Sequence, residues 1–164
     1  MGVTGVARVL ADRAAALGKP GRTLSPDERI RMTEALTNYP SWLLDLLSSV
    51  PLVGLELGWQ ADEPQSEDDG LAWVRISDAA GILRESLELH PGLDILPAGY
   101  VNFGGDAIGG GDPYFVPINE GMDPPLYQVY HDVGDDAATI LAEGRILVAP
   151  SLSEFFRTAV LLGE

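Results

Sequence analysis

The chain has 164 residues, a formal net charge of −15 and no cysteine. A chain of this length suits one domain that buries roughly 70% of its unfolded surface, and a hydrophobic content of 46% excludes a disordered protein. The lack of cysteine excludes disulfides, thiol catalysis and Cys-ligated zinc.

Targeting signals are also missing from the sequence. No run approaches the ~20 apolar residues that span a bilayer, and no basic stretch followed by an apolar core opens the chain. We therefore expect a cytoplasmic protein with no membrane partner.

The charge is very unevenly placed along the chain. Residues 1–50 carry a net charge of +1, whereas residues 51–164 carry −16. Such a field repels nucleic acid and attracts a basic partner protein. The alternative is that the charge serves only solubility.

The first quarter of the chain predicts two helices. Residues 3–17 place apolar residues at helical spacing before a Gly/Pro-rich stop, and we interpret residues 1–24 as an N-terminal helical arm. Ser25 and Glu28 form a capping box around Pro26 and predict a helix over 26–37.

The middle of the chain mixes helices and strands. Residues 41–49 predict a short buried helix, and 52–59 and 71–76 predict strands on either side of an acidic, exposed loop. Asp78 is positioned to cap a further helix that ends near residue 89.

Short apolar runs separated by Gly and Pro fill the C-terminal half and predict strands, and Ser151 and Glu154 form a second capping box. The four predicted strands cover 99–104, 113–118, 125–130 and 145–149, and the final helix covers 152–162. We expect an α+β fold over residues 25–164, in which a single antiparallel or mixed sheet packs against helices.

The order of motifs in residues 99–158 resembles the SUKH superfamily. Gly99–Gly104 precedes a glycine turn with Gly111-Asp112, an aromatic strand ends at His131, and a Ser-x-x-Glu-Phe helix follows from Ser151. That superfamily includes fungal cell-wall assembly regulators of the Knr/Smi type and bacterial immunity proteins. The resemblance implies an α+β sheet with a groove for partner proteins and no shared catalytic residues.

Two segments suggest ligand chemistry but lack the residues that it needs. The glycine run 104–112 has neither the lysine of a P-loop nor the dinucleotide fingerprint, so we expect a hairpin turn. Residues 132–143 match the length of a calcium loop, but Gly134 and Ala137 stand where a ligand and the turn glycine belong. We expect an acidic loop, no metal and no cofactor.

Catalytic candidates are equally weak. His131 and Asp132 are adjacent on a predicted strand and so point to opposite faces, and Ser151 serves as a helix cap. We expect a hydrogen-bonded histidine at a strand end and no catalytic residues. Seven aromatic residues could form a binding surface, but we expect most of them in the core, and their sequence contexts do not separate core from groove: Trp42, Trp59, Trp73, Tyr100, Tyr114, Tyr127 and Tyr130.

The leading hypothesis is a non-enzymatic protein-binding module, an immunity protein that neutralises a basic bacterial toxin by direct contact. The alternatives are a regulatory scaffold that binds a cellular protein and an unrecognised small-molecule enzyme. The carboxylates expected to contact the partner are Glu63, Glu67, Asp68, Asp69, Asp106, Asp112, Asp132, Asp135 and Asp136.

Overall fold

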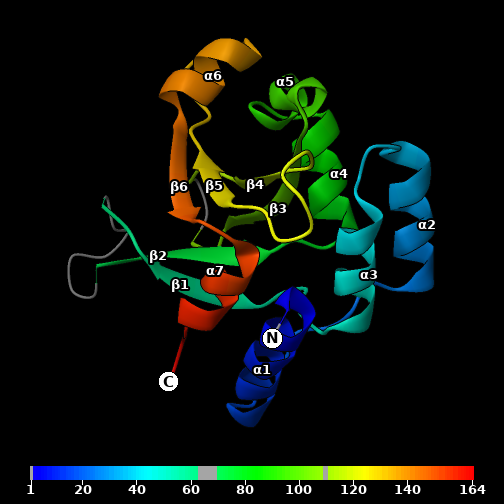
Figure 1. The fold of residues 1–164 in the computed structure, drawn as a ribbon, viewed down its shortest axis with the longest axis vertical. Coiled ribbons are helices and arrows are strands. Elements are labelled where there is room, and N and C mark those ends of the chain that lie inside the picture. The colour runs from blue at the N-terminus through cyan, green and yellow to red at the C-terminus, as the bar shows by residue number, and fades with distance from the viewer. Residues whose placement is uncertain (1, 63–69, 109–110) are drawn as a thin grey trace.

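The computed structural model describes residues 2–62, 70–108 and 111–164. These residues form an α+β fold with one seven-stranded sheet, in which every neighbouring pair of strands is antiparallel. The strand order is β6-β5-β4-β3-β2-β1-β7. The sheet is strongly curled: in Figure 1, β6 runs vertically, whereas β1 and β2 run across the picture. The expected fold class is confirmed.

The strands are β1 (Glu56–Gln60), β2 (Leu71–Ile76), β3 (Tyr100–Asp106), β4 (Tyr114–Pro117), β5 (Leu126–Val129), β6 (Arg145–Ala149) and β7 (Val160–Leu161). The helices are α1 (Val3–Ala16), α2 (Pro26–Ala35), α3 (Ser41–Ser49), α4 (Ala79–Leu87), α5 (Gly92–Ile95), α6 (Ala137–Glu143) and α7 (Leu152–Thr158). A short 3₁₀ turn over Leu96–Ala98 joins α5 to β3.

Two hydrophobic clusters lie on opposite faces of the sheet. On one face, alternate residues of β1 to β4 join α1, α3 and α7 in the main core, where the rings of Phe103 and Phe156 are 6.2 Å apart. The other face carries a smaller cluster near α5 and α6, formed by Ile95, Tyr100, Phe115, Val129 and Ile140. The alternation of strand residues therefore divides the aromatic side chains between two interiors.

The predicted arm contributes directly to the main core. Val6, Leu10 and Ala14 of α1 are buried, and α1 packs against α7 from the other end of the chain. Arg13 forms an ion pair with Glu164 and also donates to the Ala159 carbonyl at 3.3 Å. The two ends of the chain are thus joined through side chains.

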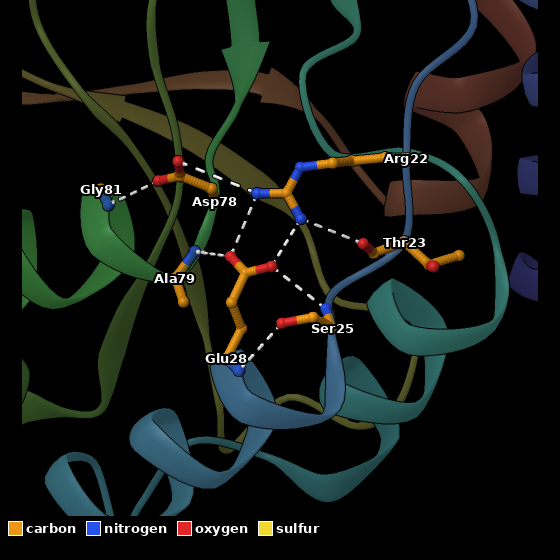
Figure 2. A network of polar contacts seen from close by, with 7 residues as sticks. All are labelled: Arg22, Thr23, Ser25, Glu28, Asp78, Ala79 and Gly81. Atoms are coloured by element: carbon orange, nitrogen blue, oxygen red, sulfur yellow. Dashed lines mark hydrogen bonds and ion pairs between the residues drawn. The ribbon is translucent and has the colours of Figure 1, made fainter.

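A network of polar contacts connects α2 to α4 (Figure 2). The predicted capping box is confirmed, since Ser25 Oγ accepts from the Glu28 N–H and Glu28 Oε1 accepts from the Ser25 N–H, both at 3.1 Å. Glu28 also accepts from Arg22 at 2.5 Å and from the Ala79 N–H at 3.1 Å. One carboxylate therefore holds the start of α2, the start of α4 and the preceding segment together.

Two predicted boundaries are wrong. The strand expected over 52–59 covers 56–60, because the Leu52 and Leu55 side chains are buried in a turn that precedes β1. The helix expected over 152–162 ends at Thr158, and Val160–Leu161 instead pairs with β1 as the edge strand β7. Pairing with the open edge of β1 outweighs the helical spacing of these apolar residues.

The loop expected over 132–143 is helical in its second half. Asp136 caps α6 by accepting from the Thr139 N–H at 3.0 Å, and Ile140 is fully buried in the smaller cluster. The prediction of an acidic loop is therefore wrong for residues 137–143, and Asp136 is a helix cap.

The glycine run begins inside a strand rather than in a turn. β3 continues through Gly104 to Asp106, and a Cβ at Gly104 would lie 2.6 Å from Val74 Cγ2 and 2.7 Å from the Arg75 carbonyl oxygen. Gly104 is therefore required by the close approach of β2, and the reversal toward β4 comes after Asp106.

Candidate functional site: the acidic end of the sheet

The order of the strands determines where the connections lie. From β1 to β6 each strand pairs antiparallel with the next one in sequence, so successive connections alternate between the two ends of the sheet. The β1–β2, β3–β4 and β5–β6 connections therefore share one end. We call this end, of which the structure describes residues 61–62, 70, 106–108, 111–113 and 130–144, the acidic end.

The acidic end holds a large share of the negative charge. Its described residues contain seven Asp and Glu residues and no Lys or Arg. These residues come from three stretches that are far apart in the chain. The predicted contacts Glu63, Glu67, Asp68 and Asp69 lie outside the described residues.

A pocket of about 310 Å³ opens at the acidic end, on the same face of the sheet as the main core. It is lined by Trp59, Ala61, Asp62, Gly111, Asp112, Gln128, Tyr130 and Ile146. Strand alternation explains the set, because Gln128 and Ile146 are paired neighbours that point to the face on which Trp59 lies. The pocket therefore begins where the packed core ends.

The inner wall of the pocket is fixed by an aromatic pair. The rings of Trp59 and Tyr114 meet edge to face with centroids 6.2 Å apart, and Trp59 Nε1–H donates to the Tyr114 hydroxyl at 2.9 Å. Burial raises the pKa of Tyr114, so this hydroxyl stays protonated. Trp59 is only 8% exposed, and its polar atom is directed away from the pocket into this bond.

A histidine–carboxylate pair lies beside the pocket. His131 follows β5 directly, and its backbone N–H donates to Asp112 Oδ1 at 2.9 Å, while its Nδ1 lies 2.5 Å from the same oxygen. The expectation of a hydrogen-bonded histidine at a strand end is confirmed. Its partner is Asp112 across the sheet and not the adjacent Asp132.

We expect His131 to titrate above the usual range of a histidine. The hydrogen bond to Asp112 raises the pKa of His131, and the charges of Asp112 and Asp132 act in the same direction. NMR titration of the imidazole should show a raised midpoint that D112N lowers, whereas D135N leaves it unchanged. A midpoint unaffected by D112N would contradict the pairing.

The same pair makes a small, pH-dependent contribution to stability. Because the folded pKa is raised, the contribution is complete below the unfolded value of ~6.5 and disappears as the pH rises through the folded pKa. His131 is mostly exposed, so solvent screening keeps the effect small.

The other predicted contacts are spread around the acidic end. Asp112 lines the pocket, whereas Asp106, at the end of β3, lines a different hollow. Asp132, Asp135 and Asp136 are exposed between β5 and α6, and Asp136 is the α6 cap. Of the predicted carboxylates that the structure describes, only Asp112 lines the pocket.

The hollow beside Asp106 carries positive charge that is already neutralised. It measures about 360 Å³ and includes Arg22 and Arg75. Arg22 binds Glu28 in the network of Figure 2, and Arg75 forms an ion pair with Glu56. These arginines serve the fold, so this hollow is a weaker candidate than the acidic-end pocket.

The pocket lining combines polar and apolar groups. Two carboxylates, an amide, a phenol and an indole lie beside Ala61, Gly111 and Ile146. Across the described ranges, no group of three or more His, Asp or Glu side chains is placed to hold a metal ion. None of the described helices combines the length and apolarity that a membrane span requires.

Sequence reasoning missed most of the pocket. It identified Asp112 but not Asp62, and it left Trp59 and Tyr130 undecided between core and groove. A usable signal was present, because each aromatic residue comes shortly before an acidic segment. No family model, curated protein or solved structure matches this chain. Function must therefore be inferred from the site itself.

Proposed function

We propose that this chain is a non-enzymatic binding protein whose acidic end holds a basic partner protein. The observation that carries the proposal is that the described residues of the acidic end hold seven carboxylates and no Lys or Arg, at the end of the sheet where a pocket with aromatic walls opens. Such a surface steers a basic partner toward it during diffusion, and aromatic residues supply much of the contact energy at protein interfaces.

The partner that best fits this surface is a basic toxin, which makes the chain an immunity protein of the cytoplasm. Nuclease toxins are basic because their substrate is anionic, so an acidic inhibitor gains rapid association and covers the substrate path at once. The resemblance of residues 99–158 to the SUKH superfamily supports the same function. A regulatory scaffold would use the same surface for a cellular protein.

The test is the rate of association with a partner retained by the immobilised chain from its native host. The triple variant D132N/D135N/D136N should lower the on-rate about tenfold at low salt, and the wild-type on-rate should fall as the Debye length shortens toward ~8 Å. Asn keeps the α6 cap, so the fold is retained.

The matched control changes the same amount of charge elsewhere. Asp12, Asp27 and Glu34 are exposed on α1 and α2, which are not part of the acidic end, and D12N/D27N/E34Q should leave the on-rate within about twofold. Equal effects of the two triple variants, or an on-rate independent of salt, would refute recognition at the acidic end. A partner encoded beside this chain would favour immunity over a regulatory scaffold.

A further inference from the structure

We propose that the acidic-end pocket receives an arginine side chain of the partner, an inference that rests on the proposed function. The pocket volume of about 310 Å³ lies at the lower end of ligand sites, ~300–1,000 Å³, which suits one long side chain better than a cofactor. The identity of that side chain follows from the hydrogen-bonding capacity of the walls.

Two donor groups of the pocket walls make hydrogen bonds within the protein. Trp59 Nε1–H donates to Tyr114, and the side-chain amide of Gln128 donates to the Asp112 carbonyl oxygen at 3.2 Å. The walls also present acceptors, namely the Gln128 amide oxygen and the carboxylates of Asp62 and Asp112, and both carboxylates carry negative charge. A ligand for these walls must therefore bring donors and positive charge.

Asp112 is positioned to bind a second donor group. Both contacts from His131 use its Oδ1, so Oδ2 is the oxygen left for an incoming cation. The carboxyl is only 18% exposed, which strengthens a charge-assisted hydrogen bond relative to one in open solvent. Asp62 is exposed and supplies a second carboxylate at the mouth.

The aromatic walls distinguish arginine from lysine. A guanidinium is planar, stacks on aromatic faces and presents five N–H donors, whereas an ammonium is compact and strongly hydrated. Trp59 and Tyr130 provide the rings. Arg145, the arginine at this end of β6, points to the other face, where its guanidinium lies 4.5 Å from the Tyr127 ring centroid and donates to the Tyr100 hydroxyl. Arg145 therefore does not occupy the pocket, which stays open to an arginine of the partner.

The experiment uses the full chain and a small probe, N-acetyl-arginine N-methylamide. Titration followed by ¹H–¹⁵N NMR should give saturable shifts of the Trp59 indole, the Gln128 side-chain amide and the His131 backbone N–H at millimolar probe. The citrulline analogue has nearly the same shape without charge, and it should bind about tenfold more weakly. Equal binding of the two analogues, or no saturable shift, would overturn the proposal.

Two single variants distinguish binding inside the pocket from attraction by the overall negative charge of the acidic end. D112N keeps an acceptor for His131 but removes charge from the pocket, and it should weaken probe binding about fivefold. D135N removes the same charge from an exposed position that does not line the pocket, and it should leave binding within about twofold. Equal weakening by D112N and D135N would show that the probe responds only to the overall electrostatic field of the acidic end, and it would contradict binding in the pocket.

Failure of this inference is distinguishable from failure of the proposed function. If the probe does not bind but D132N/D135N/D136N still slows association with the partner, the acidic end recognises its partner without the pocket. If the probe binds but partner association depends on neither salt nor charge, the arginine site stands and the proposed recognition surface is wrong.

Discussion

L10A should lower the free energy of unfolding by about 3 kcal/mol. Leu10 is 1% exposed and lies in the main core, where α1 packs against α7. Truncation removes buried methyl groups and leaves a cavity that the surrounding helices and strands fill only in part. Urea denaturation with linear extrapolation measures the loss, which should appear as a lower midpoint with an unchanged slope.

The neighbouring residue provides the control. Val9 is 47% exposed on the same helix, and V9A should change the free energy of unfolding by less than about 0.5 kcal/mol. If α1 were an arm that is dispensable for folding, the two variants would behave alike. A large difference between them would show that residues 3–16 and the α+β core unfold together.

E28A should lower the free energy of unfolding by about 2–3 kcal/mol at pH 7. Glu28 is 8% exposed and accepts hydrogen bonds from Arg22, the Ser25 N–H and the Ala79 N–H (Figure 2). Its removal leaves donors at the starts of α2 and α4 without their acceptor, which costs more than the loss of an exposed ion pair. E34A on the exposed face of α2 is the matched control and should cost less than about 0.5 kcal/mol.

The same carboxylate makes stability depend on pH in the acid range. Its hydrogen bond to Arg22, together with those from Ser25 and Ala79, lowers the pKa of Glu28 from 4.5 to about 2. Because the folded pKa is depressed, the stabilisation is complete above the unfolded value and disappears as the pH falls toward 2. The difference in stability between wild type and E28Q should therefore shrink between pH 5 and pH 3, and a constant difference would contradict the network.

Local chemistry made much of the fold predictable from sequence. The serines at Ser25 and Ser151 made two helix starts predictable, since each accepts from the backbone N–H three residues later. The full capping box forms only at Ser25, because Glu154 pairs with Arg157 instead. Residues 71–76 and 145–149 match β2 and β6, because short runs rich in branched apolar residues occupy strands that turn a face to the core. These features depend on neighbours in the chain, which a sequence displays directly.

What the sequence did not reveal depends on distant partners. The spacing of Val160–Leu161 predicts the end of a helix, and only the pairing with the open edge of β1 makes it a strand. Asp112 and His131 lie nineteen residues apart, and only the pairing of β4 with β5 brings them into contact. The pocket likewise needs the register of several strands, so its acidic residues could be predicted as a class but its aromatic walls could not.

Because successive connections alternate between the two ends of the sheet, the two ends differ in what their connections contribute to the fold. One end of the sheet carries the long β2–β3 connection through α4 and α5, which contributes to both hydrophobic clusters, whereas the acidic end carries the β1–β2, β3–β4 and β5–β6 connections. Lengthening a surface connection costs little free energy, because the entropic cost of closing a loop rises only slowly with its length. A family of such chains can thus change partner by exchanging short hairpin segments on a constant scaffold, as antibodies exchange loops on theirs.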